Sequence, residues 1–315
     1  MKLSVIVFVF DRENYVLDAL GSVFNQTAEQ SCYEVLVISN IKLEKVENKY
    51  KDKNFKIIYT DETSLWSKIK IAYSISKGEI ISFLEDDDYW ESDKIIRVIK
   101  LFESNRELSF YHNGFTFIIG DNKHQLSNQS KNANSFVYAK ANTENSFPLL
   151  LKKRADYNLS SISIRKAYFN INLLYDLKNL FIDGAIFLIC LSSGHEMCAD
   201  DLKLTFVRIH KDNNSGKVKN ISDQLERDEL SILTANFMSG RYEKNVVEFL
   251  INEMAVNYLI RYQMAKRKMA KHFIMYLISG IRGKIFPRNY VLVKSISYII
   301  YKRFAYFLQN SFHER

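Results

Sequence analysis

The chain has little of several residue types that mark whole classes of protein. Two prolines and ten glycines among 315 residues are too few for a fibrous or low-complexity protein. Its three cysteines, Cys32, Cys190 and Cys198, stand at no metal-ligand spacing, which indicates reduced thiols in a reducing compartment. No apolar run reaches the roughly 18 residues of a membrane-spanning helix. The first residues lack a small-residue cleavage site and are interpreted as a strand, not a signal peptide.

The residues that are present predict a folded α/β protein. Apolar residues make up 47% of the chain and aromatic residues 14%, which is enough for the core of one large or two moderate domains. Strand-like and helix-like runs alternate over the first hundred residues, a pattern typical of a parallel sheet covered by helices. The expected strands are residues 3–10, 33–39, 55–60 and 79–85. The expected helices are residues 12–26 and residues 64–78, with Gly78 as the C-cap of the second.

The alternation continues more loosely beyond Trp90. A helix is expected over residues 92–104, with Ser92 or Asp93 as its N-cap. The later elements are expected to be a strand at 108–119, an exposed loop or insertion at 121–146, a strand at 160–165, a helix at 182–194, a strand at 202–210, and helices beyond about Asn220.

The positive charge is concentrated at one end of the chain. The net charge is +8, yet the segment from Met254 onward holds twelve Lys or Arg and one acid, Glu314, for a net charge of +11. Its Lys and Arg residues alternate with aromatic and aliphatic residues at helical spacing. This basic tail fits a helical subdomain packed on the body, or an amphipathic segment on anionic lipid, and both can hold. Nucleic-acid binding is disfavoured because no recognition motif accompanies the charge.

Four acids follow directly on the fourth expected strand. In GEIISFLEDDDYW, residues 78–90, these are Glu85, Asp86, Asp87 and Asp88. A charge run is usually solvated surface, and one acid can cap a helix, but four adjacent carboxylates repel one another unless a cation compensates them. Ligands of open α/β sheets bind at the carboxyl ends of strands. We therefore favour a site for Mg²⁺ or Mn²⁺, which prefer oxygen ligands.

The sequence contains no glycine-rich phosphate loop. Neither GxxxxGK[ST] nor GxGxxG follows the first strand. A metal ion held by only two carboxylates keeps open positions for a substrate diphosphate, so the cation is expected to neutralise phosphate charge. Lys68 or Lys70 could assist it, although a solvated helix face explains each lysine equally well.

Four segments stand in order along the chain: SVIVFVFDRENYVLDALGSVFNQT, YEVLVISN, SKGEIISFLEDDDYWESDKI and FVRIHKDNNS. They resemble, the last more weakly, the family 2 glycosyltransferases of GT-A fold. The corresponding family patterns read like SVIIPTYNR…L..ALeSvl.QT, EiivvDDgS, a.GeyiaflDdDD.w.p.Kl and yRiH..n.S. The resemblance covers about the first hundred residues well, and it implies a nucleotide-sugar-binding sheet.

The resemblance also implies roles for the acids and their neighbours. Asp87 matches the metal ligand of the family's DXD-type motif. Glu85, Asp86 and Asp88 are implied to help hold the metal or the donor ribose. His210 falls where many GT-A enzymes have a further metal or diphosphate contact, although a lone histidine is more often structural.

Other positions are implied to bind the nucleotide or the acceptor. Phe10 falls where an aromatic ring stacks on the base, with Asp11 beside it, and Lys68 lies in the helix that usually gives a basic residue to the nucleotide side. Ser39 stands where a carboxylate commonly reads the base. Asp183 matches the catalytic base that acts on the acceptor.

The chain departs from the family pattern at four places. Ser39-Asn40 replaces the acidic pair after the second strand, so the carboxylate that commonly reads the base is missing. Phe8 stands in place of the proline, Glu85 in place of the first Asp of the acid cluster, and Ile182 in place of the Glu of the common ED pair.

Together these features predict a metal-dependent, inverting glycosyltransferase that uses a nucleotide-diphosphate-sugar donor and a glycan or lipid-linked acceptor. We expect a GT-A domain at residues 1–220, with a nucleotide-binding half at 1–120 and an acceptor half at 121–220, then a basic helical region at 221–315. The expected location is the cytoplasmic face of the membrane. Two alternatives stay open: a non-catalytic GT-A-like module that binds a nucleotide or glycan, and a nucleotidyltransferase, which the missing Gly/Arg/Lys-rich loop disfavours.

Overall fold

The computed structural model describes residues 2–119, 136–140, 150, 153–177 and 181–210, apart from residue 12. The chain divides into two units, residues 1–213 and 214–315, and all described residues belong to the first. The predicted helices beyond Asn220 and the basic tail from Met254 lie outside the described residues. The predicted loop at 121–146 also lies outside them, except for residues 136–140.

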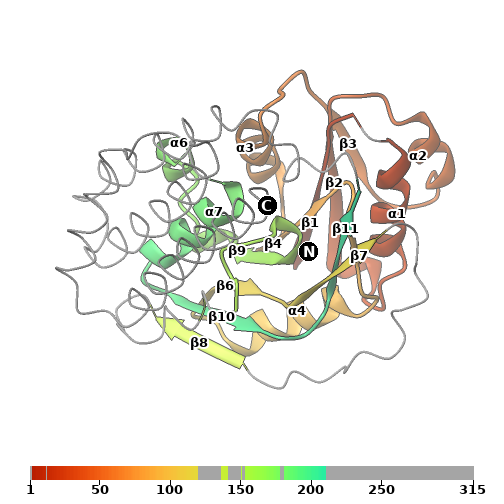
Figure 1. The fold of residues 1–315 in the computed structure, drawn as a ribbon. Helices are drawn as coiled ribbons and strands as arrows, with labels where there is room; N and C mark the ends of the chain where they lie inside the picture. The colour runs from red at the N-terminus through yellow and green to blue at the C-terminus, as the bar shows by residue number, and fades with distance from the viewer. Residues whose placement is uncertain are drawn as a thin grey trace, which may run out of the picture. The chain divides into compact units, whose positions relative to one another are not determined.

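Eight strands form one mixed sheet in the order β3-β2-β1-β4-β9-β6-β10-β8 (Figure 1). The first four strands along the chain are parallel, as predicted: β1 (Leu3–Val9), β2 (Tyr33–Ser39), β3 (Lys56–Tyr59) and β4 (Ile80–Glu85). The other four are β6 (Leu108–His112), β8 (Phe136–Lys140), β9 (Ile162–Arg165) and β10 (Glu196–Asp200). Because β9 is antiparallel to both β4 and β6, β6 is parallel to β4, and β10 is parallel to β6.

Helices cover both faces of this sheet. They are α1 (Glu13–Phe24), α2 (Glu44–Lys49), α3 (Leu65–Ile75), α4 (Lys94–Ser104), α6 (Leu173–Asp176) and α7 (Ile182–Ser192). Alternate side chains of β1, from Leu3 to Val9, pack with apolar residues of α1 and α4 in one core cluster. On the other face, Phe187 of α7 lies edge-on to Phe110 of β6 at 5.7 Å. Figure 1 shows α3 and α7 on the side of the sheet opposite α1 and α4.

A small second sheet crosses the end of the large one. It consists of β5 (Tyr89–Trp90), β11 (Thr205–Ile209) and β7 (Phe115–Ile119), with β11 between the other two. The single strand predicted at 108–119 is therefore wrong, since β6 and β7 belong to different sheets. The strand is interrupted at Gly114. A Cβ atom there would lie 2.7 Å from the backbone oxygen of Asp201, so only glycine lets the two backbone segments lie this close.

Two further expectations are wrong, one strand was not predicted, and one N-cap has other contacts than expected. Residues 136–140 of the predicted loop form β8, which pairs antiparallel with β10, and β10 was itself not predicted. Helix α3 ends at Ile75, so Gly78 is not its C-cap. A Cβ atom at Gly78 would lie 2.5 Å from the backbone nitrogen of Ser4, which shows that this glycine lets the chain pass against β1. Asp93 does occupy the N-cap position of α4, but its carboxylate pairs with Arg97 at 2.5 Å instead of bonding the helix backbone.

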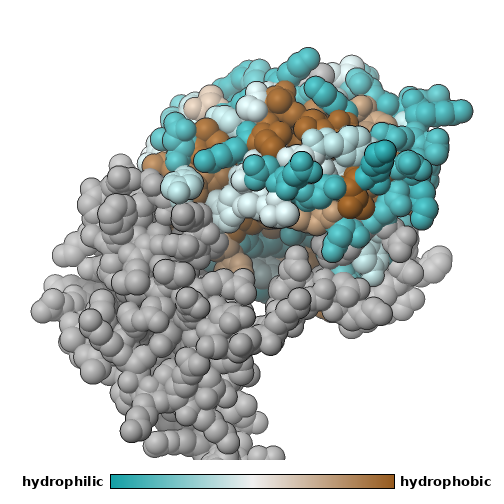
Figure 2. Space-filling model, turned by 90° about the horizontal axis from the view of Figure 1, so that it is seen from above, coloured by the Kyte–Doolittle hydropathy of each residue, from teal (hydrophilic) through white to brown (hydrophobic). Residues whose placement is uncertain are grey.

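The coloured part of the surface in Figure 2 is mainly hydrophilic, with hydrophobic residues gathered in a few patches. Large hydrophobic side chains with substantial exposure include Tyr175 of α6 and Phe181, the residue before α7. None of the described helices combines the length and the apolar character that crossing a membrane requires.

Candidate active site

The four acids lie where β4 ends, in the turn that leads into β5. Glu85 is the last residue of β4 and is in register with Phe8 of β1. The three aspartates that follow are buried, with exposures of 1%, 7% and 2% for Asp86, Asp87 and Asp88. Burial of like charges is costly unless each carboxylate has a partner. The neighbouring segments supply such partners.

The aspartates of the turn accept hydrogen bonds from three segments that are far apart along the chain. Asp86 Oδ2 accepts the backbone N–H of Phe10 at 3.3 Å. Asp87 Oδ2 lies 3.1 Å from Nε2 of His210, just beyond β11. Asp88 accepts the N–H of Arg208 at 3.1 Å and the side-chain amide of Asn158 at 3.3 Å. Segments far apart in the sequence therefore converge on the acids.

The acids still raise one another's pKa values. Burial raises the pKa of Glu85 well above its usual range, and the charges of Asp88, Asp87, Asp183 and Asp86 raise it further. Burial and then the charge of Asp87 raise the pKa of Asp88 to about 7, against hydrogen bonds from Ser160, Arg208 and Asn158. The cluster therefore carries more negative charge than its surroundings compensate, and a proton or a cation would stabilise it.

Arg208 of β11 holds the acid turn against α1. It is 3% exposed, its Nε donates to the backbone oxygen of Asp87 at 3.2 Å, and its Nη2 pairs with Asp18 at 2.8 Å. Its guanidinium also lies 4.9 Å from the ring centre of Tyr15 and 5.8 Å from that of Tyr89. The RIH segment was noted in the sequence, but only its histidine was given a role.

The residues predicted for the nucleotide side gather at the carboxyl ends of β1 and β2. Lys68 of α3 is fully buried, donates to the backbone oxygen of Val9 at 2.7 Å, and lies 3.4 Å from the ring centre of Phe10. Burial lowers the pKa of Lys68 to about 8, although the charges of Asp86 and Asp11 oppose this. The alternative of a solvated helix face is therefore wrong for this lysine.

Ser39 is also buried, and its hydroxyl serves the local backbone. Its Oγ donates to the backbone oxygen of Ile41 at 2.7 Å and accepts the N–H of the same residue at 3.2 Å. The neighbouring Asn40 donates to the backbone oxygens of Thr60 and Glu62, both at 2.8 Å. These two residues, which replace an acidic pair in the family pattern, thus shape the turn after β2.

Asp183 is linked to the acids although it lies about 100 positions further along the chain. It stands in the first turn of α7, where Oδ2 accepts the N–H of Asn158 at 2.8 Å and Oδ1 accepts the N–H of Gly184 at 3.0 Å. Burial raises its pKa, against these backbone hydrogen bonds. Asn158 donates to both Asp183 and Asp88, and the charge of Asp183 contributes to the raised pKa of Glu85, so Asp183 lies close to the acid cluster.

The fit of a divalent ion can be judged from the side chains present. Among the described residues, no three His, Cys, Asp or Glu side chains are arranged as a metal-binding group. Asp87 and His210 offer a carboxylate oxygen and an imidazole nitrogen, which suit Mn²⁺, and their side chains are 9% and 8% exposed. Asp88 is less available, because each of its oxygens accepts a hydrogen bond. The ligand set stays a prediction, with Asp87 and His210 as its best-placed members.

Three residues near the acids were not predicted as site residues, although Lys94 matches the lysine of the family pattern. Asn158 contacts both Asp88 and Asp183. Ser160 Oγ accepts the N–H of Glu85 at 3.0 Å. Lys94 is fully buried and donates to the backbone oxygen of Ser160 at 2.6 Å and to Thr205 at 2.9 Å, which ties α4 to the turn beneath the acids. Only the folded chain brings these positions together.

The fold is of the GT-A type, as solved structures confirm. S. aureus TarS in complex with UDP-GlcNAc has a TM-score of 0.61 and 16% identity, over 89% of this chain and 79% of that one. The mannosyltransferase PcManGT from Pyrobaculum calidifontis, in complex with GDP-Man and Mn²⁺, has a TM-score of 0.56 and 10% identity, over 97% of this chain and 82% of that one.

The family follows from the sequence comparison. The model of glycosyl transferase family 2 matches residues 4–167, and the chain belongs to this family. An uncharacterized glycosyltransferase of Rickettsia bellii is 26% identical over 80% of this chain and 34% of its own length. A poly(ribitol-phosphate) beta-glucosyltransferase of Bacillus spizizenii is 26% identical over 34% of this chain and 18% of its own. The chain thus spans about a third or less of these relatives.

Proposed function

We propose that the protein is a metal-dependent, inverting glycosyltransferase that moves a sugar from a nucleotide-diphosphate-sugar donor to a glycan or lipid-linked acceptor. The observation that carries this proposal is that Asn158 links two carboxylate groups by hydrogen bonds, Asp88 of the turn after β4 and Asp183 of α7. Membership of family 2 supports it, as do the nucleotide sugars named for the two structural neighbours.

Different residues of the site would act on the acceptor and on the donor. Asp183 would accept the proton of the acceptor hydroxyl, and its raised pKa makes it a better base than an exposed aspartate. Phe10, Asp11 and Lys68 would bind the nucleotide side, where the buried ammonium of Lys68 offers positive charge. Asp87 and His210 would hold a divalent cation, which when bound supplies positive charge to the leaving diphosphate. No covalent intermediate is needed in an inverting transfer.

A screen of nucleotide sugars tests this proposal directly. The protein should bind a nucleoside diphosphate and slowly hydrolyse the matching nucleotide sugar when Mn²⁺ is present, and addition of EDTA should abolish both. With an acceptor present, the product should carry the inverted anomeric configuration. Binding without turnover across a broad panel of donors and acceptors would instead support a non-catalytic binding module.

We also propose that the basic tail, from Met254 onward, holds the protein on anionic bilayers at the cytoplasmic face of the membrane. The support is its net charge of +11 and its interleaved aromatic residues. The full chain should co-sediment with vesicles that contain anionic lipid much more than with neutral ones. Binding should weaken with salt, because the Debye length is about 8 Å at physiological ionic strength. No binding to anionic vesicles at low salt would contradict this proposal.

A further inference from the structure

Asn158 has an unusual backbone conformation beside the acids. It precedes the short 3₁₀ turn Leu159–Ser161, is 7% exposed, and has φ of 69° and ψ of 101°. Among the described non-glycine residues, only Asn158 and Arg154 have positive φ. Such a conformation costs roughly 1–3 kcal/mol and persists only where surrounding interactions enforce it. The interactions of Asn158 therefore need to be identified.

The backbone N–H and the side chain of this residue make three hydrogen bonds, in addition to the bond that its backbone oxygen accepts from Ser161. Its backbone N–H donates to Asp183 Oδ2 at 2.8 Å, and its side-chain Nδ2 donates to Asp88 Oδ2 at 3.3 Å. Its Oδ1 accepts the hydroxyl of Ser161 at 2.9 Å, which fixes the amide so that its nitrogen faces Asp88. One residue thus donates to a carboxylate of the acid turn and to the carboxylate of α7.

The residue type matters for this double contact. The backbone N–H and the side-chain amide belong to one residue with a fixed φ, so the separation of the two carboxylates is set by the geometry of Asn158 itself. Glycine would accept the positive φ and keep the N–H, but it would lose the bond to Asp88. Aspartate has nearly the same shape, but it would place a further carboxylate against Asp88.

We propose that Asn158 is a positioning residue that sets the spacing between Asp88, on the donor side, and Asp183, on the acceptor side. This inference rests on the proposed function. A displacement of about 1 Å between reacting groups can cost roughly 10²-fold in rate, so the spacing of these carboxylates should control turnover more than donor binding.

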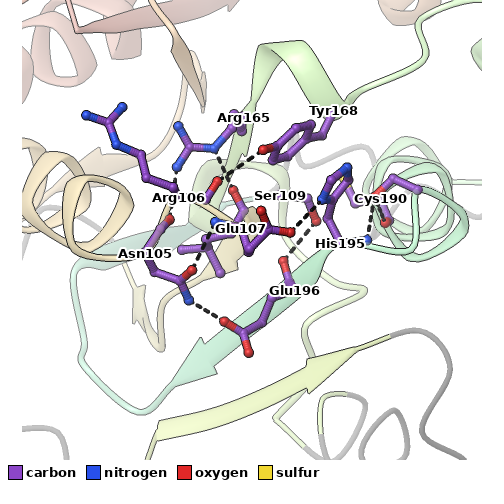
Figure 3. Close-up of polar contacts among 11 residues, drawn as sticks. Asn105, Arg106, Glu107, Ser109, Arg165, Tyr168, Cys190, His195 and Glu196 are labelled. Atoms are coloured by element: carbon purple, nitrogen blue, oxygen red, sulfur yellow. Dashed lines mark hydrogen bonds and ion pairs between the residues drawn. The ribbon is translucent and has the colours of Figure 1, made fainter.

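The chain offers a matched control at the opposite end of the sheet. Figure 3 shows Asn105, just before β6, donating its side-chain amide to the carboxylate of Glu196 at the start of β10. Since β6 and β10 are parallel to β4, these N-terminal strand ends lie away from the acid turn. Asn105→Asp makes the same chemical change against a carboxylate without touching the site.

The experiment measures kcat, donor KM and Tm for Asn158→Gly, Asn158→Asp and Asn105→Asp, all in the full chain. Asn158→Gly should lower kcat about tenfold or more, with donor KM and Tm changing little, and Asn158→Asp should lower kcat by roughly 10²-fold with little change in donor KM. Repulsion between the new carboxylate and Asp88 should also lower the Tm of Asn158→Asp, so kcat is measured at a temperature where this variant is folded. Asn105→Asp should keep the wild-type kcat. If Asn158 served only to provide the positive φ of the turn, Asn158→Gly would have a Tm and a kcat equal to or higher than those of the wild type.

Two results would overturn the inference. One is wild-type kcat in Asn158→Gly, and the other is a loss of kcat that only follows a loss of folded protein, seen by circular dichroism. Both differ from failure of the proposed function, in which the wild-type protein itself shows no turnover in the nucleotide-sugar screen.

Discussion

Replacement of Asp183 by asparagine should lower turnover by about 10²–10⁴-fold, the usual contribution of general-base catalysis. Asparagine keeps the size of the side chain, and its Oδ1 can accept one of the two backbone N–H groups that Asp183 accepts. Its amide nitrogen can accept neither the second N–H nor the proton of the acceptor. The affinity for the donor nucleotide should hardly change, because the donor is expected to bind near Phe10 and Lys68. Single-turnover kinetics together with calorimetric titration of the nucleoside diphosphate would separate these two effects.

Asp200→Asn is the matched control for this experiment. Asp200 is also a buried aspartate, and burial raises its pKa to about 6. It accepts hydrogen bonds from the hydroxyl of Tyr111 at 2.8 Å and the N–H of Leu202 at 3.0 Å, and we assign it no part in the reaction. Its variant should keep turnover close to wild type. Equal turnover in wild type and Asp183→Asn would mean that the base lies elsewhere.

The pH dependence of turnover is a second test of Asp183 as the general base. A general base works only when it is deprotonated, and burial raises the pKa of Asp183 in the folded protein. Turnover should therefore fall as the pH decreases through that raised pKa. The residual turnover of Asp183→Asn should lack this acidic limb.

The sequence predicted those helices and strands whose type is determined by their own residues, which lie mainly in the first hundred residues. Strands β1 to β4 and helices α1, α3 and α4 are continuous runs with clear periodicity, so their type and order could be predicted from their own residues. The acids after β4 could be found because parallel strands end at one edge of a sheet. The interruption of the strand at Gly114 could not be predicted, because it depends on the close approach of the backbone of Asp201, which lies on a distant segment.

The same distinction separates the predicted site residues from those that were missed. Asp87 and Asp183 lie in segments with a family pattern. Asn158 lies in a turn without periodicity, and its importance comes from its contacts with residues 70 positions before it and 25 after it. Arg208 likewise reaches back to Asp18 across 190 positions. The contacts of such residues become visible only when the chain is folded.

Replacement of Asp87 by alanine should abolish the Mn²⁺-dependent binding of a nucleoside diphosphate and leave the fold intact. Asp87 pairs with His210 at 3.1 Å, and these two side chains are the best-placed metal ligands among the described residues. The charge of Asp87 also raises the pKa values of Glu85 and Asp88. Its removal therefore relieves repulsion inside the cluster, which offsets the lost hydrogen bond, so Tm should not fall much.

Calorimetric titration of a nucleoside diphosphate, with Mn²⁺ and with EDTA, measures this effect. Asp93→Ala is the control, because Asp93 is an acid close in sequence whose carboxylate pairs with Arg97 on α4. The control should bind like wild type in both conditions, while Asp87→Ala with Mn²⁺ should bind no better than wild type with EDTA. If Asp87→Ala instead keeps wild-type affinity in Mn²⁺, the acids after β4 do not hold the cation through this residue, and the repulsion within the cluster must be relieved by protonation.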